Sequence, residues 1–130
     1  MAQVGKVIYD ILSNDGTVSG FVSTRIYPLF APQETPDPCI TYFRDQVSLN
    51  ETKDAASSLN TEDWRINVFS KTYTECEDIT DGVIAALNRV TGTNNGVKVS
   101  NVVLKNVINL YDNIDKVFQN TIEFDFVINE

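Results

Sequence analysis

The 130-residue sequence contains no histidine, only two cysteines and only one tryptophan, and all four of its prolines lie between residues 28 and 38. The absence of histidine removes the commonest general base, which serine and cysteine hydrolases of the usual kind require. Phosphate-binding loops of the GxxxxGK[ST] and GxGxxG kinds are also missing from the sequence. The sequence therefore predicts a protein that is not an enzyme and that carries no cofactor and no metal.

Basic residues are few and scattered singly along the chain. Ten Lys and Arg stand against 18 Asp and Glu, which gives a formal net charge of −8. Nucleic-acid affinity comes mainly from clustered Lys and Arg, so we expect no specific grip on DNA or RNA. An acidic wall can still surround a DNA duplex without binding it, because like charges repel each other.

Long apolar runs are absent as well. No stretch approaches the roughly 18 apolar residues of a membrane span, and the first residues lack the apolar run of a signal peptide. We expect a protein without a membrane partner that is made in a reducing cytoplasm. The two cysteines, Cys39 and Cys76, have no CxxC spacing, and we predict that both are buried core residues.

Two clusters of acidic residues and two large aromatic residues are the remaining candidates for chemistry. The first cluster is Glu75, Glu77, Asp78 and Asp81. We interpret Glu75, Glu77 and Asp78 as a solvated helix start, where negative charge complements the helix dipole. Residues 112–115 have two aspartates but lack the central glycine of a calcium loop, so they predict a polar turn. Tyr42 and Trp64 are each in phase with the apolar face of a strand, which predicts core packing.

Hydrophobic periodicity predicts two helices. Val4, Val7 and Ile8 open an i, i+3, i+4 pattern that ends near residues 14–16. The second helix is expected to begin at Thr74, with Glu77 completing a capping box, to include Val90 on its apolar side, and to stop at Gly92.

Five strand patterns accompany these helices, at residues 25–29, 39–47, 63–70, 97–108 and 118–128. Val97, Val99 and Val103 are expected on one face of the fourth strand. An exposed hairpin loop is expected at residues 48–61. The order α-β-β-β-α-β-β predicts one α+β domain over residues 1–130, with a mainly antiparallel sheet of about five strands and two helices packed on one face.

The order of several short motifs resembles the tail-terminator, or tail-completion, proteins of tailed bacteriophages. The resemblance covers nearly the whole chain except residues 48–61, which match no fixed pattern. Its motifs are the Arg25–Pro28 stretch with Pro38–Tyr42, the Trp64–Ser70 strand with Thr72–Tyr73 and Ala85–Leu87, and the closing Leu110–Asp112 and Thr121–Phe126.

This resemblance implies a structural virion protein located in the tail, at the head-tail junction. Such a protein forms a hexameric ring that caps the head-proximal end of the tail tube, ends tube growth and joins the tail to the head-side connector or stopper protein. Its partners are copies of itself, the tail tube protein and that connector, and DNA passes through the ring without specific binding. The family has no catalytic motif that could be transferred to this chain.

Two segments are the candidate assembly interface, where the chain would meet neighbouring subunits or the tube. One is the hairpin loop at residues 48–61, inferred from its polarity, length and position, and the other is residues 30–37. The candidates are Phe30, Gln33, Glu34, Leu49, Asn50, Glu51, Lys53, Asp54 and Leu59. Plain solvated loops remain the alternative for both segments. Another neck or tail component, such as a head-closure or tail tube protein, is the alternative function, followed by a small-molecule-binding module or enzyme and by a monomeric regulator.

Overall fold

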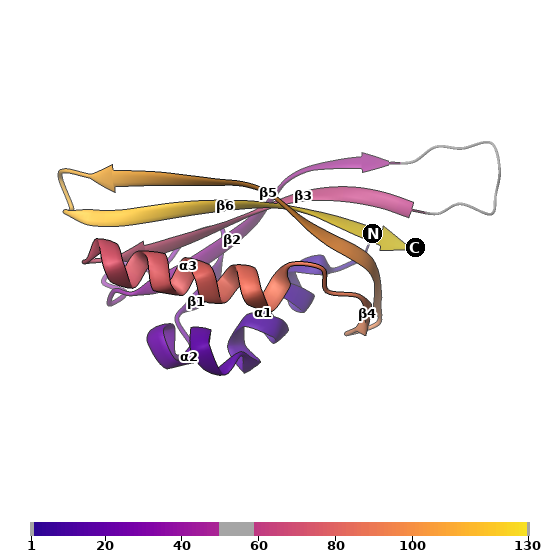
Figure 1. The fold of residues 1–130 in the computed structure, drawn as a ribbon, viewed down its shortest axis with the longest axis horizontal. Coiled ribbons are helices and arrows are strands. Elements are labelled where there is room, and N and C mark those ends of the chain that lie inside the picture. Colours follow the sequence, from indigo (N-terminus) through magenta and orange to yellow (C-terminus); the bar gives the residue numbers. More distant parts are fainter. Residues whose placement is uncertain (1, 50–58, 130) are drawn as a thin grey trace.

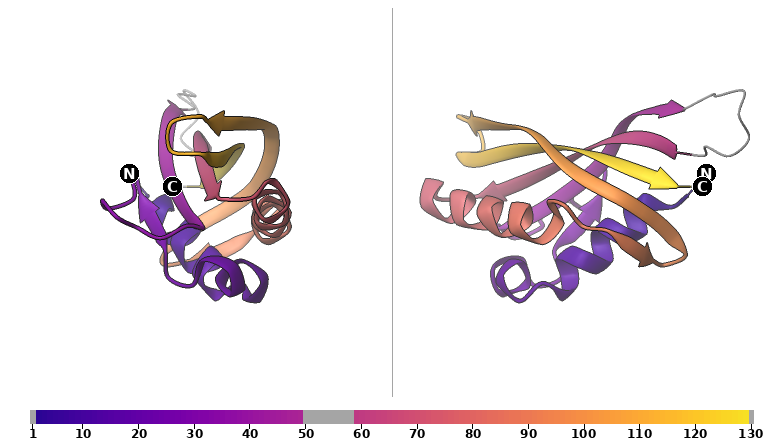
Figure 2. Two further views of the ribbon diagram at one scale, coloured as in Figure 1. Left: turned by 90° about the vertical axis from the view of Figure 1, so that its left-hand side faces the viewer. Right: turned by 45° about the vertical axis from the view of Figure 1, so that its right-hand side comes forward.

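The computed structural model describes residues 2–49 and 59–129, and within them three helices cover one face of a six-stranded sheet (Figure 1). The strand order is β1-β2-β3-β6-β5-β4; β1 runs parallel to β2, and every other pair is antiparallel. The sheet is strongly twisted and curls along its length (Figure 2). The α+β class and the one-sided helix layer are confirmed, but the numbers of strands and helices are each one larger than predicted.

The extra helix lies directly after the first. Helix α1 spans Val4–Asn14, as its periodicity predicts, and α2 spans Gly16–Val22. Asp15 separates the two helices, and its carboxylate accepts hydrogen bonds from the backbone N–H groups of Thr17 and Val18, both at 3.0 Å. Asp15 therefore marks the end of one helix and also caps the start of the next.

Strands β1 (Ile26–Pro28), β2 (Cys39–Leu49) and β3 (Leu59–Ser70) form one side of the sheet. The pairing of β2 with β3 reaches Leu49 and Asn60, so the strands take up both ends of the region predicted as a loop. Residues 50–58 lie outside the described residues. The edge strand predicted at residues 25–29 is confirmed as β1.

Helix α3 spans Tyr73–Leu87 and starts earlier than the sequence pattern indicates. The residue that caps it is Thr72 and not Thr74, because the Thr72 hydroxyl accepts a hydrogen bond from the Glu75 backbone N–H at 3.3 Å. The helix ends at Leu87, so Val90 lies beyond it, packed against the core from the following turn. Gly92, predicted as the stop signal, instead begins a short strand.

Strands β4 (Gly92–Asn94), β5 (Val97–Asp112) and β6 (Val117–Asn129) complete the sheet. The predicted face of β5 is wrong at Val103, which is 43% exposed, whereas Val102 is fully buried. A register shift between Val99 and Asn101 adds one residue to β5, and such a bulge moves every later side chain to the other face.

The core lies between the helices and the sheet. Phe124, Phe126, Ile122 and Ile128 of β6 are fully buried in it, and Trp64 is nearly so. The predictions that Trp64 and Tyr42 pack in the core, and that both cysteines are buried, are confirmed. Among the described residues, no helix combines the length and the apolar character needed to cross a bilayer.

Candidate assembly surface

The segment of residues 29–37 connects β1 to β2 and is held at both ends. At its start, the Leu29 backbone N–H donates to the Tyr42 carbonyl at 2.8 Å. At its end, Asp37 forms an ion pair with Lys71 at 3.7 Å, and just beyond it Arg25 Nε donates to the Pro38 carbonyl at 2.8 Å. The segment is therefore anchored to the sheet by its ends, while its middle projects into solvent.

Phe30 is the most prominent apolar residue of this segment. Its side chain is 72% exposed, and Gln33 and Glu34 beside it are exposed as well. Leu29 and Glu34 adopt positive φ angles of 67° and 68°, a conformation that is uncommon outside glycine. The predicted interface residues Phe30, Gln33 and Glu34 thus lie together on an exposed, turned segment.

A groove of about 580 Å³ lies between this segment and the sheet. Glu34, Asp37, Asp112 and Asp115 contribute carboxylates to its lining, and Lys71 contributes the ammonium group. The groove lining therefore carries an acidic excess, which disfavours phosphate groups.

Three polar residues of the groove lining, Thr41, Asn67 and Gln119, form a hydrogen-bond network with Thr121. Asn67 Oδ1 accepts from Thr121 Oγ1 at 2.8 Å and from Gln119 Nε2 at 3.3 Å, while Asn67 Nδ2 donates to Thr41 Oγ1 at 3.3 Å. Because these polar groups bind one another, the network stabilises the sheet and leaves few of them for a ligand.

Neither cysteine is a nucleophile at neutral pH. Burial raises the pKa of the Cys39 thiol to about 11, with a further rise from Asp37 and a smaller lowering by Arg25. Burial is also the main cause that raises the pKa of Cys76 to about 11. Since the thiolate is the reactive form, both side chains behave as small apolar groups.

The acidic clusters noted in the sequence have structural roles. Asp112 Oδ1 accepts hydrogen bonds from the Ile114 and Asp115 backbone N–H groups, which confirms the predicted turn. Glu77 differs from a solvated carboxylate, because it accepts hydrogen bonds from Asn109 and Asn120, both at 2.9 Å. Within the described part of the chain, no group of three or more Asp, Glu, Cys or His side chains is arranged to hold a metal ion.

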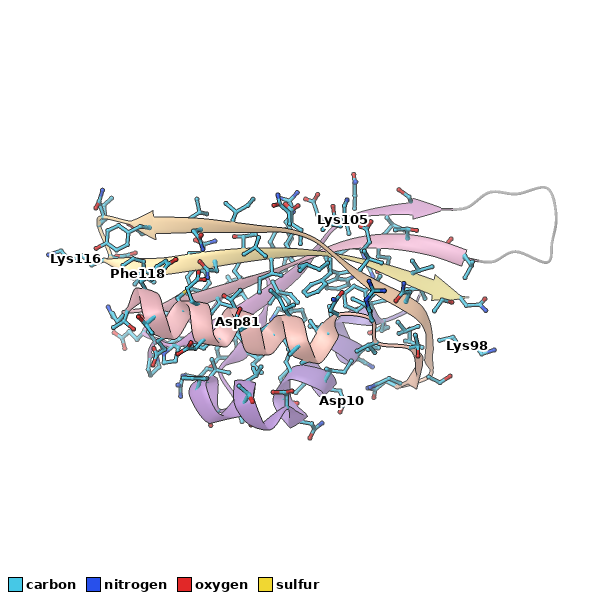
Figure 3. The ribbon with its side chains drawn as sticks, viewed as in Figure 1. Asp10, Asp81, Lys98, Lys105, Lys116 and Phe118 are labelled. Atoms are coloured by element: carbon cyan, nitrogen blue, oxygen red, sulfur yellow. The ribbon has the colours of Figure 1, made fainter. Side chains whose placement is uncertain are left out.

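The sheet face away from the helices carries charges of both signs. Arg65 lies 3.3 Å from both Asp45 and Glu123, and Lys105 lies 3.6 Å from Asp125. Lys105 projects from this face in Figure 3. Asp63 is buried among these charges, and one of its carboxylate oxygens has no hydrogen-bond partner. Burial raises its pKa, while Lys105 and Arg65 act in the opposite direction.

Two of the remaining predicted interface residues, Leu49 and Leu59, have their backbones at the other end of the sheet. Leu59 begins β3 opposite Asn129, whereas Cys39, next to the 29–37 segment, lies opposite Phe69 at the far end of β3. The structure therefore does not bring Leu59 together with Phe30. Asn50, Glu51, Lys53 and Asp54 lie outside the described residues, as does the side chain of Leu49.

Sequence reasoning missed a third surface, the end of the β5–β6 hairpin. Its exposed apolar side chains are Val107, Ile108, Leu110, Tyr111 and Ile114. The Tyr111 ring is tilted against the Phe118 ring at a centroid distance of 4.7 Å, and the Tyr73 ring lies edge-on to Phe118 at a centroid distance of 5.9 Å. The available signal was four apolar residues within residues 107–111, too many for a strand with one solvated face.

Comparison with known proteins agrees with the sequence resemblance. A family model described as "Tail completion protein gp17" matches residues 6–129. A chain in a solved structure of the virion of a native gene transfer agent (GTA) particle has a similar fold, with a TM-score of 0.80 at 13% identity over 99% of this chain and 98% of that chain. No curated protein matches the sequence.

Proposed function

The chain belongs to the tail completion protein gp17 family and is a structural virion component of the tail or neck. From this premise, we propose that it caps the head-proximal end of the tail tube as a hexameric ring. The ring ends tube growth and joins the tail to the head-side connector. The match of the family model to residues 6–129, almost the whole domain, is the observation that carries this proposal.

The exposed apolar residues support assembly with other proteins. Phe30 and the end of the β5–β6 hairpin present large apolar side chains at two places on the surface. Contiguous exposed apolar surface on a small protein is typical of interaction sites. We assign the first surface, with Gln33 and Glu34, and the chain around Leu49 to Leu59 to contacts with neighbouring subunits or with the tube.

The charge distribution supports passage of DNA through the ring. The net charge is −8, and Arg65 and Lys105 are paired with carboxylates on the open face of the sheet. A duplex therefore meets repulsion and not a basic binding surface, which allows it to slide. The ring carries out no catalysis in this role.

The test is the mass of the purified protein by light scattering over a concentration series, with and without purified tail tubes, followed by electron microscopy. Rings of six subunits bound at one end of each tube, and shorter tubes when the protein is added during polymerisation, are the expected result. Self-polymerisation into tubes would identify a tube protein, and binding only to the head connector would identify a head-closure protein. A strict monomer that ignores tubes would overturn the proposal.

A further inference from the structure

The outer edge of β5 is open along half of its length. Strand β4 pairs only with Val97–Val99. Beyond it, the Arg89 backbone N–H donates to the Val102 carbonyl, the Leu104 N–H donates to Asn88 Oδ1, and the Val107 N–H donates to the side-chain Oδ1 of its own neighbour Asn106. Among the described residues, no strand pairs with this edge over residues 105–112. An open strand edge presents backbone donors and acceptors to any strand that lies beside it.

The side chains along this edge favour such pairing. The strand exposes between 37% and 49% of each of four apolar side chains, Val107, Ile108, Leu110 and Tyr111, so apolar groups occur on both of its faces. Natural proteins usually protect an open edge with prolines or inward-pointing charges. The open part of β5 has no proline, and its one lysine, Lys105, is paired with Asp125. The edge is therefore suited to association.

A second open edge lies on the opposite side of the sheet. Strand β1 pairs only with Ile40–Tyr42 of β2, and the Leu29 hydrogen bond to Tyr42 ends this cover. Over residues 43–48, no described strand pairs with the outer edge of β2. The short strands β1 and β4 cover opposite ends of the sheet, so the two open edges are also at opposite ends.

We propose that the open edge of β5 in one copy pairs with the open edge of β2 in the next copy, which rests on the ring proposed above. Strands β2, β3, β6 and β5 alternate in direction, so β2 and β5 run opposite ways and two copies in the same orientation form an antiparallel pair. A contact between two unlike edges is heterologous, and repeating it generates a closed ring when the rotation closes.

The same geometry gives the offset between neighbouring copies. Within one sheet, the row through Ile108 crosses Thr121 and Asn67 and reaches Thr41 on β2. The middle of the open β2 edge is Gln46, which pairs with Asp63, four residues from Asn67 along β3 (67 − 63 = 4). Pairing Ile108 with Gln46 therefore shifts each copy by about 13 Å along the strand.

This offset is compatible with closure, because strands in a closed sheet run obliquely to its axis. Both side chains also lie on one face of the sheet, the face away from the helices, as pairing requires. The offset further keeps β4 of one copy away from β1 of the next, since each covers the end of its sheet that the contact does not use.

The test is cross-linking between engineered cysteines in otherwise native protein. Ile108→Cys is mixed with Gln46→Cys or with Ser48→Cys, and the mixture is treated with an oxidant or a short bismaleimide. Ser48 follows Gln46 by two residues on β2 and so lies on the same face of the sheet. We expect a covalent dimer from each mixture of single variants, and a ladder up to the ring mass when both cysteines are in one chain. The native cysteines are buried, and their pKa values of about 11 keep them unreactive.

Ile114→Cys mixed with Gln46→Cys is the matched control, because Ile114 is highly exposed but lies in the turn beyond β5. This mixture should remain uncross-linked. Rings that form without a link from Ile108 to either β2 position would overturn the edge pairing and leave the proposed function intact. A link between two Ile108→Cys chains would overturn it in favour of a twofold dimer. Linked rings that do not bind tube ends would support the edge pairing and overturn the capping function.

Discussion

The two faces of the sheet differ in what holds their side chains. On the helix-covered face, Phe124, Phe126 and Ile122 are fully buried under α1 and α3. On the opposite face, Asn67, Thr121 and Gln119 hydrogen-bond to one another, and Ile108 and Leu110 remain exposed. The first face stabilises the monomer, whereas the second is available for association. Substitutions on the two faces should therefore separate folding from assembly.

The largest loss of stability is expected from Phe124→Ala. The Phe124 ring is fully buried and packs edge-on against Phe126 at a centroid distance of 6.3 Å. Removing it leaves a cavity, which costs about 3 to 5 kcal/mol of unfolding free energy. Urea unfolding followed by tryptophan fluorescence measures the change. Val103→Ala is the control on the opposite face, and an equal loss there would contradict the division between faces.

A smaller but still large loss is expected from Glu62→Ala. The Glu62 side chain is 1% exposed on the core side of β3, and its Oε1 accepts from Trp64 Nε1 at 2.9 Å and from Arg44 Nε at 2.8 Å. Its removal leaves the indole N–H unpaired in the core and the guanidinium without its partner. We expect a cost of about 2 to 3 kcal/mol, reduced because Arg44 is partly solvated.

The same urea titration measures the Glu62 effect, and Glu123→Ala is its control. Glu123 also pairs with an arginine, Arg65, but this pair lies on the face away from the helices. Arg65 has a second partner, Asp45, which remains when Glu123 is removed. That substitution should cost well under 1 kcal/mol. Similar costs for the two glutamates would contradict the assigned role of burial.

The start of α3 supplies a third, intermediate effect. Thr72→Ala removes the hydroxyl that accepts from the Glu75 backbone N–H, and loss of such a cap costs about 1 kcal/mol. Thr74→Ala is the matched control, since Thr74 is exposed within the first turn and should change stability by less than about 0.5 kcal/mol. A larger effect at Thr74 than at Thr72 would show that Thr74 caps the helix, as the sequence pattern indicates.

The misplaced cap shows how far sequence alone leads in this fold. Strand β6 is predicted well because polar and apolar residues alternate strictly from Thr121 to Phe126. Helix α2 is missed because its seven residues include two glycines, Gly16 and Gly20, and its cap, Asp15, also ends α1. The burial of Val102 in place of Val103 follows from a bulge, and counting alternate positions cannot detect one added residue.

The candidate surface was predictable only where local sequence determines it. Phe30, Gln33 and Glu34 are found from composition, since prolines around them exclude regular structure and leave them exposed. The β5 edge depends on which strands lie beside it. That arrangement is set by contacts such as Lys98 with Asn129, far apart in the chain, so a local pattern shows the apolar residues but not the open edge.

The pH dependence of Asp63 gives a fourth, smaller effect. Burial raises its pKa in the folded state, so folding favours the protonated form, and the charged form lowers stability. This contribution to stability is present below the unfolded pKa and is lost as the pH rises through the folded pKa. Asp63→Asn should therefore stabilise the protein at pH 7, with an advantage that shrinks toward acid pH.

Thermal unfolding at several pH values measures the Asp63 effect. Asp125→Asn, on the same face but paired with Lys105, is the control and should show no stabilisation at pH 7. A constant difference between Asp63→Asn and the native protein at every pH would show that the carboxylate does not titrate differently on folding.

The smallest effect on monomer stability, within about 0.5 kcal/mol, is expected from Leu110→Lys, because this side chain is half exposed on the face away from the helices. The effect of the same substitution on ring assembly should be large. A lysine on an open edge adds a charge that must be desolvated when another strand pairs with it, so rings should be lost while the monomer stays folded. Light scattering and circular dichroism on one sample separate the two results. Ile114→Lys removes a similar apolar side chain outside the strand and should leave rings intact, so loss of rings in both variants would point to general surface charge and not to the β5 edge.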